Sequence, residues 1–203
     1  MRDLSYIVAA FWLVCFTFSC TKKPTWEELN AQTKSLYQEE RYVEALKISE
    51  EAVRVAKIQY GPEHQNVAKS LNNLGALYKI QGDYKKAEAL YFDSLEIKKK
   101  IFGEEHPQVA HSYNNLGNIY AILERFDEAD AYFTLALEIY QKHPEQNRSE
   151  LILLYDNMAT LYKQLYMVEK GDKYARLARE LEATEQSQNT TPLIPTEKDE
   201  VRK

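Results

Sequence analysis

A stretch of eight residues returns along this chain at a fixed interval of 42 residues. Residues 71–78 read LNNLGALY, residues 113–120 read YNNLGNIY, and residues 155–162 read YDNMATLY. One interval earlier, residues 29–36 read LNAQTKSL, a degenerate copy. Four copies that keep one register predict an array of equivalent units stacked on one another.

Each unit predicts two amphipathic helices. Apolar residues recur at spacings of three and four, as in Leu71, Leu74, Leu77, Ala87, Leu90, Tyr91 and Leu95. Gly82-Asp83 separates the two helices of one unit, and Tyr60-Gly61-Pro62 and Phe102-Gly103 separate successive units. We therefore expect helical hairpins whose helices are about 15–18 residues long.

Small residues recur where neighbouring helices must approach closely. Gly75, Gly117 and Ala159 share one position on the first helix of their units, and Ala87 and Ala129 share one on the second helix. A large side chain at such a contact would overpack it at a cost of roughly 1–3 kcal/mol. Stacked hairpins would then bury one continuous core.

At these residues the chain resembles the tetratricopeptide repeat. The family pattern of apolar, Leu, Gly and Tyr followed by Gly, Tyr, Ala, aromatic and small residue is met by Leu71, Leu74, Gly75, Tyr78, Gly82, Tyr84, Ala87, Tyr91 and Ser94. The 42-residue variant with FGEEHPQVA between units is similar to kinesin light chain repeats and their bacterial relatives. The resemblance implies an all-α, right-handed α-solenoid of four units, at about residues 26–60, 68–102, 110–143 and 149–182.

The same resemblance implies a concave groove lined by the first helices. Counting positions within the repeat, its candidate ligand-contacting residues are Asn30, Lys34, Lys69, Asn72, Asn73, Ala76, His111, Asn114, Asn115, Asn118, Asp156, Asn157 and Thr160. Asn73, Asn115 and Asn157 recur at even steps, and an amide offers both donors and an acceptor. Such a row can hold an extended peptide by its main chain, or it can serve only the packing of neighbouring helices. A full set of basic residues that would clamp a chain terminus is missing.

The N-terminus predicts an export signal. Residues 6–18 are uncharged and apolar, which matches a signal-peptide core and is too short for a membrane-spanning helix. Ser19-Cys20 follows and resembles a bacterial lipoprotein cleavage site, although Thr17 and Phe18 depart from that pattern. Residues 1–19 are then a signal peptide, Cys20 carries the lipid, and residues 20–25 form a tether. An uncleaved anchor and simple secretion stay open as alternatives.

The remaining composition favours a binding protein and not an enzyme. A net charge of −5 argues against a nucleic-acid partner. After residue 20 there is no cysteine, no phosphate-binding glycine loop and no nucleophile motif, so we expect no cofactor, no metal and no small-molecule substrate. His64 and His106 recur as turn residues, and Lys98-Lys99-Lys100 is interpreted as the basic end of a helix. Residues 183–203 are polar with two prolines and predict a disordered tail.

Together these features predict a scaffold lipid-anchored in a bacterial cell envelope, on the outer membrane or the periplasmic face, which binds an extended segment of a partner protein in its groove. The alternative is a structural subunit of an envelope assembly of the secretion or pilus type, which would use its convex or edge surfaces.

Overall fold

The computed structural model describes residues 23–189, and this part of the chain forms eight α-helices and no strand. In chain order the helices are α2 (Trp26–Gln38), α3 (Tyr42–Tyr60), α4 (Gln65–Ile80), α5 (Tyr84–Phe102), α6 (Pro107–Ile122), α7 (Phe126–Tyr140), α8 (Arg148–Gln164) and α9 (Val168–Asn189). The all-helical solenoid predicted from the repeat is confirmed.

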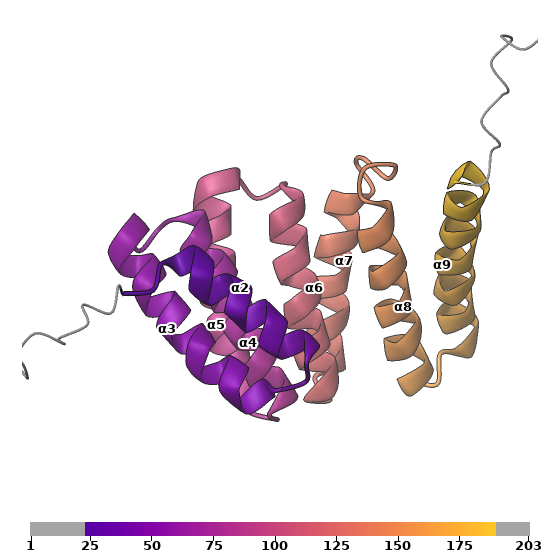
Figure 1. Cartoon of the computed structure of the whole chain (residues 1–203). Coiled ribbons are helices and arrows are strands. Elements are labelled where there is room, and N and C mark those ends of the chain that lie inside the picture. Colours follow the sequence, from indigo (N-terminus) through magenta and orange to yellow (C-terminus); the bar gives the residue numbers. More distant parts are fainter. Residues whose placement is uncertain (1–22, 190–203) are drawn as a thin grey trace, which may run out of the picture.

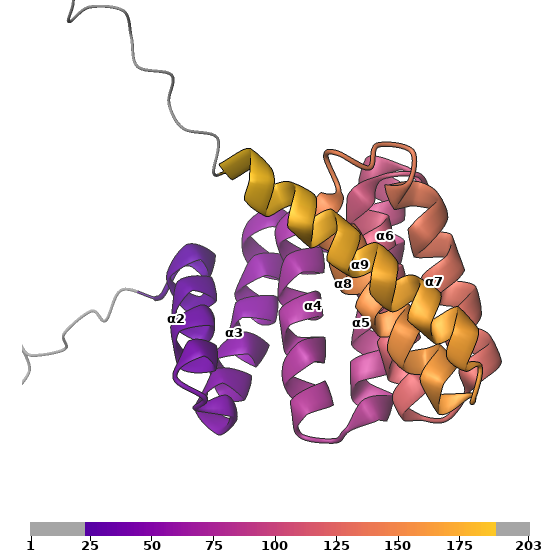
Figure 2. The ribbon, with the colours of Figure 1, turned by 90° about the vertical axis from the view of Figure 1, so that its right-hand side faces the viewer.

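The helices pack in the order in which they occur. Each contacts the next along the chain, and α6 also contacts α8, the first helix of the following unit. The four hairpins are α2–α3, α4–α5, α6–α7 and α8–α9, with α2 and α9 at opposite ends (Figure 1). In the second view α9 crosses the end of the stack diagonally and closes it (Figure 2).

The predicted small positions lie at the helix contacts. Ala87 and Ala129 are fully buried. A Cβ added to Gly75 would lie 2.9 Å from Cε1 of Tyr91, and one added to Gly117 would lie 2.5 Å from Cε1 of Phe133. Both distances are inside van der Waals contact, so a side chain at either position would displace the aromatic ring that packs on the glycine.

The connections between the first three units share one design. The φ angles of Gly61 and Gly103 are 87° and 84°, which L side chains rarely adopt. Nδ1 of His64 accepts a hydrogen bond from the Asn66 amide, and His106 does the same at α6, each at 3.1 Å. Their rings stack on Tyr60 and Phe102 at 4.6 Å. The structural duty predicted for the two histidines is confirmed.

The last connection lacks this glycine and histidine arrangement. There α7 ends at Tyr140, and the buried Asn147 donates through Nδ2 to the carbonyls of Tyr140 and His143. An internal asparagine therefore replaces the glycine cap.

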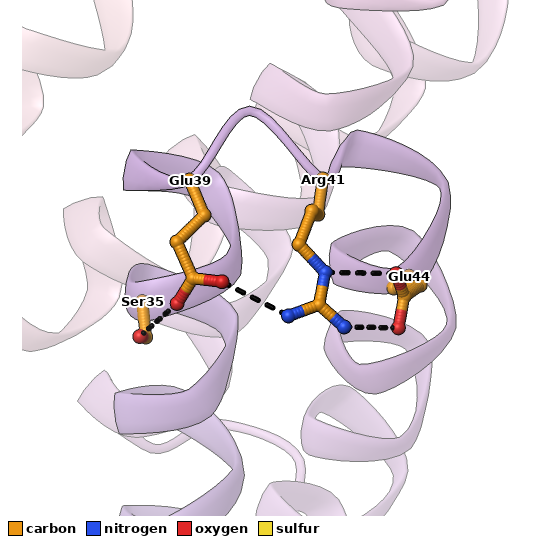
Figure 3. A network of polar contacts seen from close by, with 4 residues as sticks. All are labelled: Ser35, Glu39, Arg41 and Glu44. Carbon is orange, nitrogen blue, oxygen red and sulfur yellow. Dashed lines mark hydrogen bonds and ion pairs between the residues drawn. The ribbon is translucent and has the colours of Figure 1, made fainter.

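Within the units, the turn between the two helices has one residue of positive φ in each copy: Glu40, Gly82, Glu124 and Tyr166. Around the first of these turns Arg41 donates to Glu39 at 2.9 Å and to both oxygens of Glu44, and Ser35 donates to Glu39 at 2.8 Å (Figure 3). The guanidinium of Arg41 lowers the pKa of both carboxyl groups. These exposed pairs add little stability, and they fix the turn locally.

One predicted boundary is corrected. Helix α9 continues to Asn189, beyond the expected start of a disordered tail at residue 183, because no glycine or proline occurs between Gly171 and Pro192. The signal peptide, Cys20 and residues 190–203 lie outside the described residues. Between residues 23 and 189 no helix is long and apolar enough to span a membrane.

Candidate binding groove

Most of the predicted groove residues line three hollows between successive first helices. The first hollow, of about 330 Å³, lies between α2 and α4 and is lined by Asn30, Thr33, Lys34, Tyr37, Lys69, Asn73, Ala76 and Leu77. The middle hollow, of about 650 Å³, is lined by Gln65, Asn66, Lys69, Asn72, Asn73, Lys98, Phe102, Gln108 and His111. The last hollow, of about 400 Å³, is lined by Lys79, Asn114, Asn115, Asn118, Ala121, Ile122, Leu153, Asn157, Thr160, Leu161 and Gln164.

The asparagines form a ladder that joins the units. Nδ2 of Asn73 donates to Oδ1 of Asn30 at 3.2 Å, Asn115 donates to Asn72 at 2.8 Å, and Asn157 donates to Asn114 at 2.9 Å. Each bond spans 43 residues, one more than the repeat. The second asparagine of one unit therefore bonds the first polar position of the unit before it.

The ladder does not use up the amides. Each bond takes one N–H of the donating asparagine and leaves its second N–H and its carbonyl oxygen. Nδ2 of Asn115 also lies 3.4 Å from Nδ1 of His111. Among the described residues no buried side-chain nitrogen or oxygen lacks a hydrogen-bond partner. The remaining amide groups are therefore the ones that solvent, or a ligand, can reach.

Two predicted residues are placed differently from the others. Asn114 is only 3% exposed, because its side chain sits under the contact with Asn157. Asp156 is exposed and lines none of the three hollows. The roles of the other residues as ligand contacts stay predictions.

Sequence reasoning missed Lys98. The run Lys98-Lys99-Lys100 ends α5 as predicted, but its three side chains go to three different places. Lys98 is 5% exposed and donates to Oγ of Ser112 at 2.9 Å. Lys99 lies over the ring of Tyr113, and Lys100 pairs with Glu63. The repeat could have indicated that Lys98 is buried, because the positions 42 residues before and after it are Ala56 and Tyr140, which are both buried.

Burial shifts both titratable groups at the back of the middle hollow. It lowers the pKa of Lys98 to about 8. Burial, followed by the nearby charge of Lys98, lowers the pKa of His111 to about 4, so the imidazole is neutral at pH 7. No group of three or more potential metal ligands occurs in the described part of the chain.

Comparisons with known proteins agree with this geometry. A family model described as tetratricopeptide repeat matches residues 34–100 and 81–142, which together exceed half of the 203 residues. No curated protein sequence matches the chain.

Similar solved structures share the fold. The crystal structure of BtubC (BKLC) from P. vanneervenii has a TM-score of 0.72 at 23% identity over 88% of this chain and 70% of that one. The apo form of RapI has a TM-score of 0.71 at 18% identity over 92% and 67%. The nearly identical TPR-like repeats of a kinesin-light-chain-like protein from Podosopora anserina have a TM-score of 0.66 at 18% identity over 90% and 85%. With the repeat period, the hairpin stack and the family match in agreement, the chain belongs to the tetratricopeptide repeat family, whose fold is a protein-interaction scaffold.

Proposed function

We propose that this protein is a membrane-tethered, non-enzymatic adaptor that docks an extended segment of a partner protein in the groove formed by the three hollows. The observation that carries the proposal is the asparagine ladder. It fixes amide groups at even spacing along the first helices and leaves uncommitted the carbonyl oxygen of each donating asparagine, with a second N–H at Asn73 and Asn157. Evenly spaced amides match the main chain of an extended peptide, whatever its side chains.

The electrostatics of the groove support a peptide of neutral or acidic character. The chain contains 31 acidic residues, but no carboxylate is among the residues that line the three hollows. Their charged side chains are lysines: Lys34 and Lys69 in the first hollow, Lys98 in the middle one and Lys79 in the last. An acidic protein with a mildly basic groove favours such a partner segment.

A direct test uses immobilised peptides with capped ends and matched versions whose main-chain nitrogens are methylated at alternate residues. We expect binding to persist when the side chains of the peptide are changed and to be lost when its main-chain nitrogens are methylated. The reason is that the amides of the groove hydrogen-bond to the main chain of the peptide. Equal binding of methylated peptides would contradict the proposal.

The groove variant must leave the ladder intact, because replacing Asn73, Asn115 and Asn157 would also loosen the stack. Ala76, Asn118 and Thr160 share one repeat position and make no ladder bond; Ala76 lines the first hollow, and Asn118 and Thr160 line the last. Changing all three to Gln alters both ends of the groove, and we expect it to abolish binding of a peptide that spans the three hollows. A matched control changes Ile58 and Leu135 to Ala, two exposed residues of the second helices. The structural-subunit alternative predicts the reverse result: the control loses its assembly partner, and the groove variant keeps it.

The tether is a separate part of the proposal and rests on the sequence of residues 1–25. We expect Cys20→Ala to abolish incorporation of radiolabelled fatty acid and to release the chain from the membrane fraction of cells. A variant at Cys15 is the matched control, since it lies inside the apolar run. Lipid incorporation that persists in Cys20→Ala would contradict the lipoprotein assignment and would leave the proposed peptide binding in the groove untouched.

A further inference from the structure

A buried ammonium without a carboxylate partner lies at the back of the middle hollow. Lys98 is 5% exposed, and in the described part of the chain no acidic oxygen comes within ion-pair distance of its Nζ. Its Nζ donates a hydrogen bond to Oγ of Ser112 at 2.9 Å, and that hydroxyl in turn donates to the carbonyl of Gln108. An ammonium has three donors, so this neutral bond leaves most of its hydrogen-bonding capacity and all of its charge uncompensated.

The fold does not need a lysine at this place. The equivalent positions in the flanking units hold Ala56 and Tyr140, both buried and neither carrying a charge at neutral pH. Placing an unpaired charge among packed helices disfavours folding, whereas an apolar residue there would stabilise the core. A lysine is therefore costly for packing at this position, and a ligand that supplies the missing charge would offset that cost.

The other groups around the hollow would also favour an anion. Oδ1 of Asn72 is engaged by Asn115, which turns the uncommitted part of that amide into a donor. Lys69 adds a second positive charge at the rim. Gln65, Asn66 and Gln108 belong to the first turns of α4 and α6, where the positive ends of the helix dipoles attract negative charge. None of the lining residues is acidic.

We propose that the middle hollow is a carboxylate-binding subsite in which Lys98, supported by Lys69 and the Asn72 amide, receives an acidic group of the docked segment. This subsite deepens the proposed function, since it assigns a chemistry to one point along the peptide. The carboxylate comes either from an Asp or Glu side chain or from a chain terminus. A terminus would require the segment to end at α4–α6, halfway along the groove.

The experiment uses the full chain and two probes. The first is sodium acetate, added against sodium chloride of equal ionic strength, with the pKa of Lys98 followed by NMR of its side-chain nitrogen. We expect acetate to raise that pKa and to leave the exposed, ion-paired Lys100 unchanged. The second is a set of random heptapeptides with a fixed central Asp or Asn and capped ends, together with a set that carries a free terminal carboxylate.

In the peptide sets we expect wild-type protein to prefer the acidic members by about tenfold or more. Lys98→Met and Lys98→Gln should lose this preference while still binding the neutral peptides, and Lys99→Met should keep it. Circular dichroism confirms that each variant is folded. Preference for Asp over Asn in the capped set identifies a side-chain carboxylate, and preference for the free end alone identifies a terminus.

The outcomes separate the two proposals. Binding of capped peptides without any acidic preference overturns the carboxylate subsite and leaves the adaptor function standing. A raised Lys98 pKa in acetate without any peptide binding supports the subsite and overturns the adaptor function. If acetate leaves Lys98 unchanged and the acidic peptides show no Lys98-dependent preference, the subsite is wrong.

Discussion

The two middle units and the two end units fill the same helix contact in opposite ways. In the middle units the first helix carries Gly75 or Gly117, and the second helix carries a large ring, Tyr91 or Phe133. At the equivalent repeat positions the first unit has Thr33 and Ser49, and the fourth has Ala159 and Ala175. Where the ring is absent, the glycine is absent too.

This difference shows that the glycine is needed only where the facing helix carries a large ring. A close helix contact has no room for a ring and an opposing Cβ, whereas a small facing residue leaves room for Thr33 or Ala159. In the two middle units, one large ring packs against one glycine. In the two end units, two small or medium side chains face each other, and the hydroxyl of Thr33 donates to the carbonyl of Leu29 at 2.9 Å.

The largest expected effect comes from removing a middle ring. Phe133→Ala empties a fully buried position, so we expect the free energy of unfolding to fall by about 3–5 kcal/mol. Denaturant unfolding followed by circular dichroism measures it. Ile58→Ala, at an exposed site of α3, is the control and should change stability by less than about 0.5 kcal/mol. A small loss at Phe133 would show that the middle contact collapses as readily as an end contact.

The next effect concerns the lysine that distinguishes one middle unit from its neighbours. Burial lowers the pKa of Lys98 to about 8 from 10.5, so between these pH values the unfolded chain holds a proton that the folded chain has released. Stability therefore rises with pH across this window, and the full penalty is present below pH 8. Lys98→Met should be more stable than wild type by about 3 kcal/mol at pH 7, with the gap narrowing toward pH 10.5.

Denaturant unfolding of both proteins at pH 7, 9 and 10.5 tests this. Met is chosen because it keeps the length of the side chain without its charge. Parallel curves with no narrowing would mean that Lys98 is not buried in solution, and would remove a premise of the carboxylate subsite.

A smaller effect ranks the two middle glycines. An added methyl would lie 2.5 Å from the Phe133 ring at Gly117 and 2.9 Å from the Tyr91 ring at Gly75. Alanine gains about 1 kcal/mol of helix propensity at either site, against about 1–3 kcal/mol of overpacking. We expect Gly117→Ala to lower the melting temperature clearly and Gly75→Ala to be close to neutral. The reverse order, measured by calorimetry, would break the link between ring distance and the need for glycine.

The smallest expected effect is at the ladder bond between the third and fourth units. Asn157→Ala removes the donor to Asn114 and should cost about 1 kcal/mol. Because units couple mainly to their neighbours, hydrogen exchange should accelerate in α8 and α9 and stay unchanged in α2 and α3. Asn118→Ala, outside the ladder, is the matched control. Uniform acceleration along the chain would indicate that the end units unfold together with the middle.

Much of this architecture follows from the sequence. The 42-residue period set the number of units, the spacing of apolar residues set the helices, and the histidines and glycines between units marked their caps. These features are local, because a helix period, a cap or a positive φ depends on residues only a few positions apart. The groove residues could be named for the same reason, since they recur at four positions of the repeat on the first helices.

Only the tertiary structure decided how those residues are used. The ladder joins asparagines 43 residues apart, not 42, because the relative placement of successive first helices brings the second asparagine of one unit beside the first polar position of the previous one. The sequence did not show in which direction the side chain of Lys98 points. Three adjacent lysines look alike in sequence, but successive side chains on a helix point about 100° apart, so one enters the core while the next two reach the surface.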